Sequence, residues 1–486
     1  MSPILVFSVV AGYFSLLILI SFFTSRKSDT ASFFNANKKS PWYLVAFGMI
    51  GASLSGVTFI SVPGWVGSSS FSYFQIVLGY LIGYSAIALI LLPLYYKLNL
   101  VSIYTYLEQR YGKYSHQTGS AFFLLSRVIG AAFRLFLVAG VLQLAFFDAF
   151  NIPFIVTVIV TIFLIWIYTF RAGIKTIVWT DTLQTSFMIL AVIVSIIMIA
   201  KNLNLDFGSL VDTVVDNNNS QIFFWDWRDP HFFVKDFVAG AFIAFVMTGL
   251  DQDMMQKNLT CKTLKESQKN IFTMSISLLP VNILFLSLGV LLYVFAAQNN
   301  IALPSASDDL FPMLAINHFG TFAGITFLIG IIAAAFSSAD SALTALTTAF
   351  SIDFLKLDIK NNDRKTKRTK MFVHLGVSAT VIAVILIFKA INNDSVISQI
   401  FKVAGYTYGP LLGLFIFGLA TKQKIKDIFV PIVAILSPIL SYLFAKIIET
   451  YTEYSFGFEL LILNGALTFL GLLIIRKKNK KDTLKL

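Results

Sequence analysis

Charged residues, cysteine and histidine are all scarce in this chain of 486 residues. Only 13% of the residues are charged and 57% are hydrophobic, whereas soluble domains have about 25% and about 45–50%. One cysteine and four histidines exclude an internal disulfide framework and a cysteine–histidine metal cluster. The composition therefore excludes a soluble multidomain enzyme, a disordered chain and a secreted disulfide-rich protein.

Long apolar runs fill most of the sequence. A helix needs about 20 mostly apolar residues to cross a bilayer, whereas strands of a membrane barrel are short and alternate in polarity. We therefore predict an all-α integral membrane protein with about 13 transmembrane helices. The predicted spans lie at residues 3–24, 42–64, 71–98, 118–148, 152–169, 176–201, 232–250, 270–296, 320–351, 372–391, 395–420, 427–447 and 456–475.

Basic residues gather in alternate connections between these spans, and the net charge is +12. The opposite connections are poor in Lys and Arg, and the longest, at about 202–231, carries five aspartates. Because cytoplasmic loops are enriched in Lys and Arg, we predict an external N-terminus and a cytoplasmic C-terminus. The basic tail at 476–486 is expected to anchor at the anionic inner leaflet rather than bind nucleic acid. The basic set comprises Arg26, Lys27, Lys38, Lys39, Lys97, Arg110, Lys113, Arg171, Lys175, Lys257, Lys262, Lys265, Lys269, the run at 356–370, Lys422, Lys424 and Lys426.

Small and polar residues interrupt the span at 42–64. Its central part runs from Gly48 to Thr58 and contains three glycines with Ser and Thr between them. Such a stretch is prone to unwinding, which frees backbone carbonyls to bind a cation. A small-residue face for close helix packing explains the same pattern equally well.

One face of the span at 320–351 carries hydroxyls and a carboxylate. Ser337, Asp340, Ser341, Thr344 and Thr348 follow helical spacing. A dehydrated alkali cation requires hard oxygen ligands, and a carboxylate inside a membrane is costly unless a positive charge neutralises it. The pattern therefore indicates a sodium site. The alternative is a packing seam in which Asp340 pairs with an Arg or Lys.

Two cationic or acidic positions in other spans leave alternatives open. Asp181 is either a cation ligand or a favourable charge near a helix N-terminus. Arg134 lies about mid-span, where it either pairs with a protein carboxylate or receives an anionic substrate group. Internal pairing is slightly favoured, because it needs no additional molecule.

Polar residues also mark the ends of two spans. Gln75 either caps a pocket or lies at a helix interface. The stretch from Thr248 to Lys257 is either an inner gate, with Asp251, Gln252 and Gln256 as its candidates, or a solvated helix end.

The runs from Gly173 to Gln184 and from Ala333 to Ser341 together resemble the sodium:solute symporter family. The first run is close to the family pattern G-x-K-x-x-x-W-T-D-x-x-Q. The resemblance covers essentially the whole chain and implies a LeuT-type fold with inverted five-helix repeats. It implies a single transport domain over 1–486, with an extra N-terminal span at 3–24, repeats at 42–201 and 232–420, and two extra spans at 427–475.

The resemblance also implies site residues. The conserved sodium site would use the carbonyls of Gly51, Leu54 and Ala334 with the hydroxyls of Ser337 and Ser338; Gly51 replaces a more usual Ala, a change expected to matter little for a backbone ligand. A second sodium site would use Asp181, Ser337, Asp340 and Ser341. The substrate-binding candidates are Ser53, Ser55, Thr58, Gln75 and Arg134.

The predicted function is sodium-coupled symport of a small polar organic solute by alternating access, not an enzymatic activity. Sialic acid symporters look similar in placing an arginine in the corresponding third core helix, so the resemblance favours an anionic solute such as sialic acid or another carboxylate. The alternatives are a sodium-coupled sugar or amino-acid symporter and, from other classes, a sodium-selective channel or a sensory membrane module. We expect the protein to function as a monomer in the cell membrane, with Na⁺ and the solute as its ligands.

Overall fold

The computed structural model of the chain describes residues 3–25, 36–100, 102–169, 174–357, 364–391, 396–452, 454 and 456–477. Several residues used above lie outside these ranges. They are Arg26, Lys27, Arg171, Gly173, part of the basic run at 356–370, and the tail beyond Lys477.

Within the described ranges the chain is helical, and its few β-bridges are isolated. The first half contains α1 (Pro3–Ser25), α3 (Trp42–Ser69), α4 (Tyr73–Ala86), η2 (Ile87–Leu91), α5 (Leu92–Lys97), α6 (Thr105–Arg110), α7 (Lys113–Leu142), η3 (Gln143–Phe147), α8 (Phe154–Thr169), α9 (Ile174–Asn202) and α10 (Phe207–Val215). The second half contains α11 (Phe233–Ala244), η6 (Phe245–Gly249), α12 (Gln252–Asn258), α13 (Leu264–Gln298), α14 (Leu310–Asn317), α15 (Gly320–Ala349), η8 (Phe350–Phe354), α16 (Arg364–Ile391), α17 (Val396–Ala420), α18 (Val430–Thr452) and α19 (Leu460–Ile474). Short 3-10 turns are η1 (Ala36–Lys38), η4 (Asp148–Phe150), η5 (Asn218–Ser220), η7 (Ser307–Asp309) and η9 (Asp427–Phe429).

Each of the thirteen predicted spans overlaps a helix, but their count is not confirmed. Among the described residues, ten helices are long and apolar enough to cross a membrane. An eleventh span results if α11 and α12, which meet at a bend of 73°, are counted as one. Phe154–Trp166 and Leu460–Ile474 are apolar but shorter, so tilt and local packing decide whether they cross fully.

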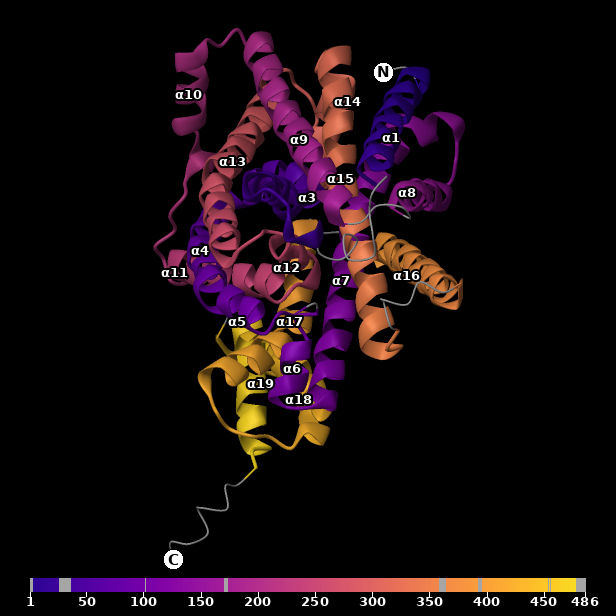
Figure 1. Cartoon of the computed structure of the whole chain (residues 1–486). Helices are drawn as coiled ribbons and strands as arrows, with labels where there is room; N and C mark the ends of the chain where they lie inside the picture. The colour runs from indigo at the N-terminus through magenta and orange to yellow at the C-terminus, as the bar shows by residue number, and fades with distance from the viewer. Residues whose placement is uncertain are drawn as a thin grey trace, which may run out of the picture.

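Two groups of helices pack side by side around the centre of the molecule (Figure 1). In the first group α3 packs on α13, α13 on α4, and α4 on α11. In the second group α15 packs on α7, α7 on α16, and α8 on both α15 and α16. Helix α9 contacts α3 and α15, so it joins the two groups, and α17 packs on α7 and on α19.

Each of the two series of consecutive helices, α3–α9 and α11–α17, begins with a broken helix. Ser55 in α3 has φ 53° and ψ 178°, so the helix is interrupted there, which confirms the predicted unwinding of this span. The second break separates η6, which ends at Gly249, from α12. Single π-helical turns also end both α7 and α15. The two series α3–α9 and α11–α17 thus share their irregular features, as the LeuT-type prediction requires.

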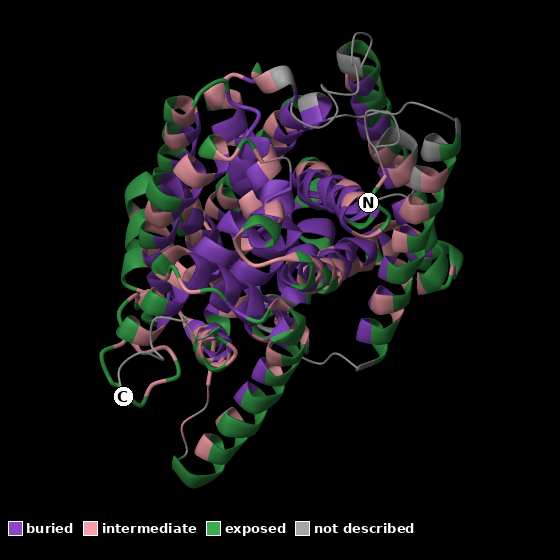
Figure 2. Cartoon of the chain, turned by 60° about the horizontal axis from the view of Figure 1, so that its bottom comes forward, coloured by how far each residue is buried: buried purple, intermediate pink, exposed green. Residues whose placement is uncertain are grey.

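The buried residues concentrate in the middle of the bundle (Figure 2). Most of α3 and α15 is buried, whereas α1, α16 and α18 expose most of their apolar side chains. Apolar side chains on the outside and polar groups inside are what a protein in a lipid bilayer requires. The polar residues that would be costly to expose to lipid therefore lie where the two groups of helices meet.

Candidate functional site

A cavity lies beside the break in α3. Its polar lining comes from α3, α4, η6 (the continuation of α11) and α7, and so from helices of both groups. The polar lining residues are Ser53, Ser55, Thr58, Tyr73, Tyr80, Tyr84, Arg127, Arg134 and Thr248. Its mixed polar and apolar walls are those of a site for a small organic molecule.

The break gives the cavity its polar wall on α3. Ser55 Oγ accepts a hydrogen bond from the Val57 amide at 3.3 Å. Ser53 Oγ and the Tyr84 hydroxyl share a hydrogen bond at 3.2 Å, while Thr58 follows one turn later. Three of the five predicted substrate-binding residues therefore lie together on one wall.

Arg134 also lines this cavity, and it forms no ion pair with a carboxylate among the described residues. Its Nε atom is buried and has no hydrogen-bond partner in the described part of the chain. The internal pairing of Arg134, which the sequence slightly favours, is not seen with any carboxylate of the described residues. A guanidinium that forms no direct ion pair with a described carboxylate, in a cavity between membrane helices, is suited to a planar carboxylate.

Arg127, on the same face of α7, is the arginine that pairs internally. It is 6% exposed, and its guanidinium lies 2.5 Å from Asp253 and 3.3 Å from Asp251. The Tyr408 hydroxyl donates to Asp251 at 3.2 Å. Sequence reasoning named Arg134 but missed this pairing, because the spacing of two arginines does not say which one meets the acids of α12.

Asp251 also starts α12. Its Oδ1 atom accepts hydrogen bonds from the amides of Asp253 and Met254, at 2.9 and 3.2 Å, which is the arrangement of a helix N-cap. Gln252 accepts a hydrogen bond from the Ile103 amide at 2.9 Å. Asp251 and Gln252 are buried and Gln256 is half-buried, so the alternative of a solvated helix end is wrong.

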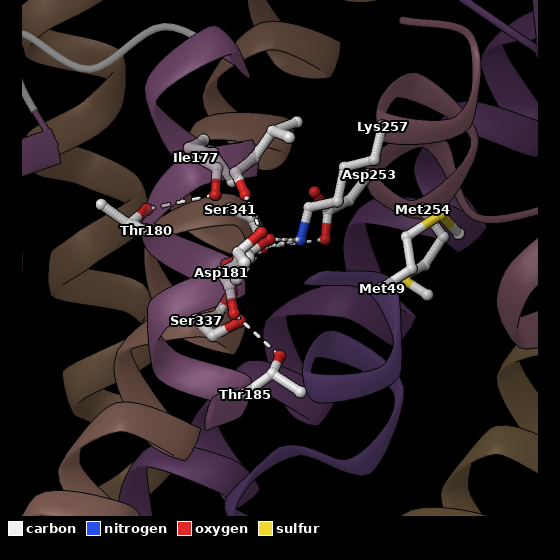
Figure 3. Close-up of polar contacts among 12 residues, drawn as sticks. Met49, Ile177, Thr180, Asp181, Thr185, Asp253, Met254, Lys257, Ser337 and Ser341 are labelled. Carbon is white, nitrogen blue, oxygen red and sulfur yellow. Dashed lines mark hydrogen bonds and ion pairs between the residues drawn. The ribbon is translucent and has the colours of Figure 1, made fainter. Parts of the chain in front are cut away.

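A second ion pair lies next to the first and joins three helices (Figure 3). Lys257 Nζ on α12 is 2.9 Å from Asp181 Oδ2 on α9, and Ser337 Oγ on α15 donates to Asp181 Oδ1 at 2.7 Å. Ser341 Oγ donates to Asp253 at 3.0 Å and accepts from Lys257 at 3.3 Å. Three of the four residues predicted for a second sodium site thus meet.

The structure also bears on two further predictions, the loop position of Lys257 and the role of Asp340 as a ligand. Lys257 is not a residue of a solvated cytoplasmic loop, because its side chain is 1% exposed and paired. Asp340, the fourth predicted ligand, is fully buried on α15. The hydroxyl of Tyr13 on α1 lies within electrostatic range of both Asp340 and Asp181.

The residues predicted for the conserved sodium site lie on two adjacent helices. Gly51 and Leu54 precede the break in α3, and Ala334, Ser337 and Ser338 lie on α15, which packs on α3. Ser338 Oγ is buried and has no hydrogen-bond partner among the described residues. A buried hydroxyl oxygen without a protein partner is suited to a cation that supplies the missing contact.

We expected glycine in place of alanine at position 51 to matter little, but the structure shows that helix packing requires it. A Cβ atom at this position would overlap Thr185 Oγ1 on α9 and lie 3.0 Å from the Thr185 Cβ. The missing side chain therefore sets the distance between α3 and α9, even though a ligand at Gly51 would be its backbone carbonyl.

Gln75 does not line the cavity. Its amide nitrogen donates to the His231 carbonyl at 2.7 Å and to Asp236 at 3.3 Å, and its oxygen accepts from the Phe224 amide at 3.2 Å. Gln75 thus ties the start of α4 to the segment before α11, which agrees with an interface role.

The model of the sodium:solute symporter family matches residues 33–426. The sodium/sialic acid symporter NanT of Aliivibrio fischeri is 27% identical over 83% of this chain and 80% of its own length. The sodium/sialic acid symporter SiaT of Proteus mirabilis is 24% identical over 89% and 88%. The human sodium/iodide cotransporter is 23% identical over 84% of this chain and 65% of its own length.

Two solved structures share the fold. A substrate-bound, outward-open sodium-coupled sialic acid symporter superposes with a TM-score of 0.80 at 21% identity, covering 98% of this chain and 99% of the other. Mhp1, a nucleobase-cation-symport-1 family transporter in a closed conformation, superposes with a TM-score of 0.56 at 13% identity, covering 91% and 93%. These likenesses agree with the LeuT-type prediction.

Proposed function

The chain belongs to the sodium:solute symporter family, a family of sodium-coupled transporters rather than enzymes, and from this premise we propose that it imports a small organic anion of the sialic acid class. The solute would occupy the cavity beside Ser55 with its carboxylate on Arg134. The sodium gradient would drive the uptake.

The lack of an ion pair between Arg134 and any carboxylate of the described residues is the observation that carries this proposal. Within one helix, Arg127 is neutralised by two aspartates while Arg134 meets none of the described carboxylates. The Arg134 side chain is only partly exposed, and a cation between membrane helices is costly unless an anion pairs with it, so binding of an anionic solute is expected to recover that cost. The hydroxyls of Ser53, Ser55 and Thr58 would hold the polar groups of the same molecule.

We place the driving sodium ion between α3 and α15. The carbonyls of Gly51, Leu54 and Ala334 and the hydroxyls of Ser337 and Ser338 would be its ligands. The unpartnered Ser338 Oγ and the interruption of α3 at Ser55 support this assignment. A bound sodium ion would tie the two helix groups together, and it can favour one state only by binding that state more tightly.

The ion pairs of Arg127 and Lys257 would form the inner gate, with Asp251 and Gln252 as members. We call the two ion pairs of Arg127 and Lys257 the ion-pair layer. This layer lies on the side of the cavity toward α6, because Tyr104 donates to the Leu250 carbonyl at 2.8 Å and the Ile103 amide donates to Gln252. Opening the inner path would require these contacts to separate, as alternating access demands.

We propose an external N-terminus and a cytoplasmic C-terminus, with the monomer as the working unit in the cell membrane. Helix α1 starts at the end of the molecule that carries α10 and the aspartate-rich segment (Figure 1). Helices α5 and α6, with Lys97 and Arg110, lie at the other end, where α19 also finishes. This distribution is the one that the positive-inside rule favours.

Uptake by proteoliposomes with an inward sodium gradient tests the proposal. Labelled sialic acid is the probe, with monocarboxylates, amino acids and sugars as unlabelled competitors. We expect sodium-dependent uptake, and Arg134→Ala is expected to raise KM at least about tenfold, because a hydrogen bond to a charged group contributes roughly 1.5–3 kcal/mol. Arg228→Ala, at an exposed arginine of the outer segment, is the control. Wild-type KM in Arg134→Ala would contradict the proposed carboxylate contact.

A second variant tests the sodium site separately. Ser338→Ala removes a hydroxyl that has no hydrogen-bond partner in the described chain, so the fold should keep its stability in sodium-free buffer. The sodium concentration for half-maximal uptake is expected to rise severalfold. An unchanged sodium dependence would remove Ser338 from the ligand set.

A further inference from the structure

The ammonium group of Lys257 lies inside a cluster of oxygen atoms that has the chemistry of a cation site. The Asp181 carboxylate and the Ser337 and Ser341 hydroxyls form this cluster, and all three side chains are at most 2% exposed. Carboxylate and hydroxyl oxygens are the hard ligands that an alkali cation takes when its water is removed. In this structure the positive charge at the cluster belongs to the protein itself.

We propose that Lys257 is a tethered cation that takes the place of a second sodium ion, so that the protein binds and transports a single sodium ion. The inference rests on the sodium site proposed above and adds the number of ions that are coupled to transport.

The local charges support this assignment. Asp181 and Lys257 carry opposite charges 2.9 Å apart, so the pair is neutral without a bound ion. A sodium ion held by Asp181, Ser337 and Ser341 would lie directly beside the ammonium group of Lys257. Two positive charges in such close contact repel strongly in a dry interior. The carboxylate therefore has room for one cation only.

The position of Lys257 in the chain gives the tether a mechanical role. The lysine lies on α12, the inner half of the broken span, whereas Asp181 lies on α9 and Ser341 on α15. Arg127 on α7 holds Asp253 of the same short helix. Movement of α12 would withdraw both cationic contacts together, and the lysine would return with the helix instead of leaving with the solute.

Sodium stoichiometry also sets the electrical character of transport. A single sodium ion that accompanies a singly charged carboxylate moves no net charge across the membrane. A second sodium ion would make the same cycle carry one positive charge inward, and each 100 mV would then contribute to accumulation.

Equilibrium binding of ²²Na⁺ to the purified full-length protein tests the proposal without any organic substrate. The wild type is expected to bind one sodium ion per molecule with a Hill coefficient near one. Lys257→Ala frees Asp181, and we expect two ions per molecule and a Hill coefficient that rises toward two. Two ions bound by the wild type, or one ion bound by a folded Lys257→Ala variant, would overturn the proposal.

Three controls keep this result interpretable. Lys257→Gln replaces Lys257→Ala if the alanine variant does not purify as a monodisperse protein. Asp181→Asn combined with Lys257→Gln removes both charges and should bind one ion, like the wild type. Lys265→Ala removes an exposed lysine of α13 and should change neither number.

The outcome separates this inference from the proposed function. Absence of sodium binding in every variant would reject the proposed sodium site itself. Sodium binding without sialic acid uptake would reject the proposed solute and leave the ion count intact.

Discussion

The layer of ion pairs and the cavity next to it are built from the same helices but treat charge in opposite ways. In the layer, Arg127 and Lys257 each meet a carboxylate at 2.5 to 2.9 Å. In the cavity, Arg134 meets none of the described carboxylates. Paired buried charges hold a structure in one arrangement, whereas an unpaired charge needs a ligand. The difference separates the part that would close the inner path from the part that would bind the solute.

Removing the arginine of the layer should have the largest effect on stability. Arg127→Met leaves Asp251 and Asp253 buried with one cation fewer between them, and removal of one partner of a buried ion pair costs about 3–5 kcal/mol. We expect a much lower unfolding temperature in detergent, measured by differential scanning fluorimetry. Asp253→Asn in the Arg127→Met background should recover part of the loss, because it removes one of the stranded charges.

Arg134→Met is the matched variant on the same helix. It removes a guanidinium that forms no ion pair with a described carboxylate, so the free energy of unfolding in substrate-free buffer should stay within about 1 kcal/mol of the wild-type value or rise. Equal losses from the two substitutions would show that the layer and the cavity do not differ in the way described.

The helices follow from local sequence, and so they could be predicted. Apolar runs long enough to cross a bilayer need no tertiary information, and each predicted span contains a helix. The small and hydroxyl residues around Ser55 allowed either unwinding or close helix packing, and the structure shows the interruption of α3. The exact number of spans could not be predicted, because α8 and α19 are short and α11 continues into α12 across a bend.

Pairing between distant segments could not be predicted from the same patterns. Lys257 follows a polar stretch and has the sequence context of a loop lysine, yet it meets Asp181 from another helix in the core. Arg127 and Arg134 share one face of α7, but seven residues separate them by about 10.5 Å along the axis. Both arginines line the cavity, but that offset lets only one of them reach the acids of α12. Only the packing of α12 reveals that it is Arg127.

The contact between Gly51 and Thr185 gives a prediction of intermediate size. Gly51→Ala forces a methyl group against Thr185, and overpacking of this kind costs about 1–3 kcal/mol. The separation of α3 and α9 would widen next to the proposed sodium ligands. We expect weaker sodium binding, measured with ²²Na⁺, in addition to a lower unfolding temperature.

Thr185→Ala provides the rescue for this variant. It removes Oγ1 and leaves the Thr185 Cβ, at 3.0 Å, as the nearest atom to the new methyl group. The double variant should regain most of the stability and sodium affinity that Gly51→Ala loses. If the double variant is no better than the single one, the approach of α3 to α9 does not explain the requirement for glycine.

The single cysteine offers the mildest test, because it reports on the layer without disturbing it. Cys261 lies between α12 and α13, is fully buried, and burial raises the pKa of its thiol to about 12. At pH 8 only about 10⁻⁴ of such a thiol is ionised, against about a quarter for an ordinary cysteine. Maleimide labelling of the wild type should therefore be slow and should rise tenfold per pH unit up to pH 10. A Lys265→Cys variant in a Cys261→Ala background should instead level off above pH 9.

Arg127→Met, which loosens α12, should speed labelling of Cys261, whereas Arg134→Met should not. Equal acceleration by both variants would mean that the cavity and the ion-pair layer open as one unit.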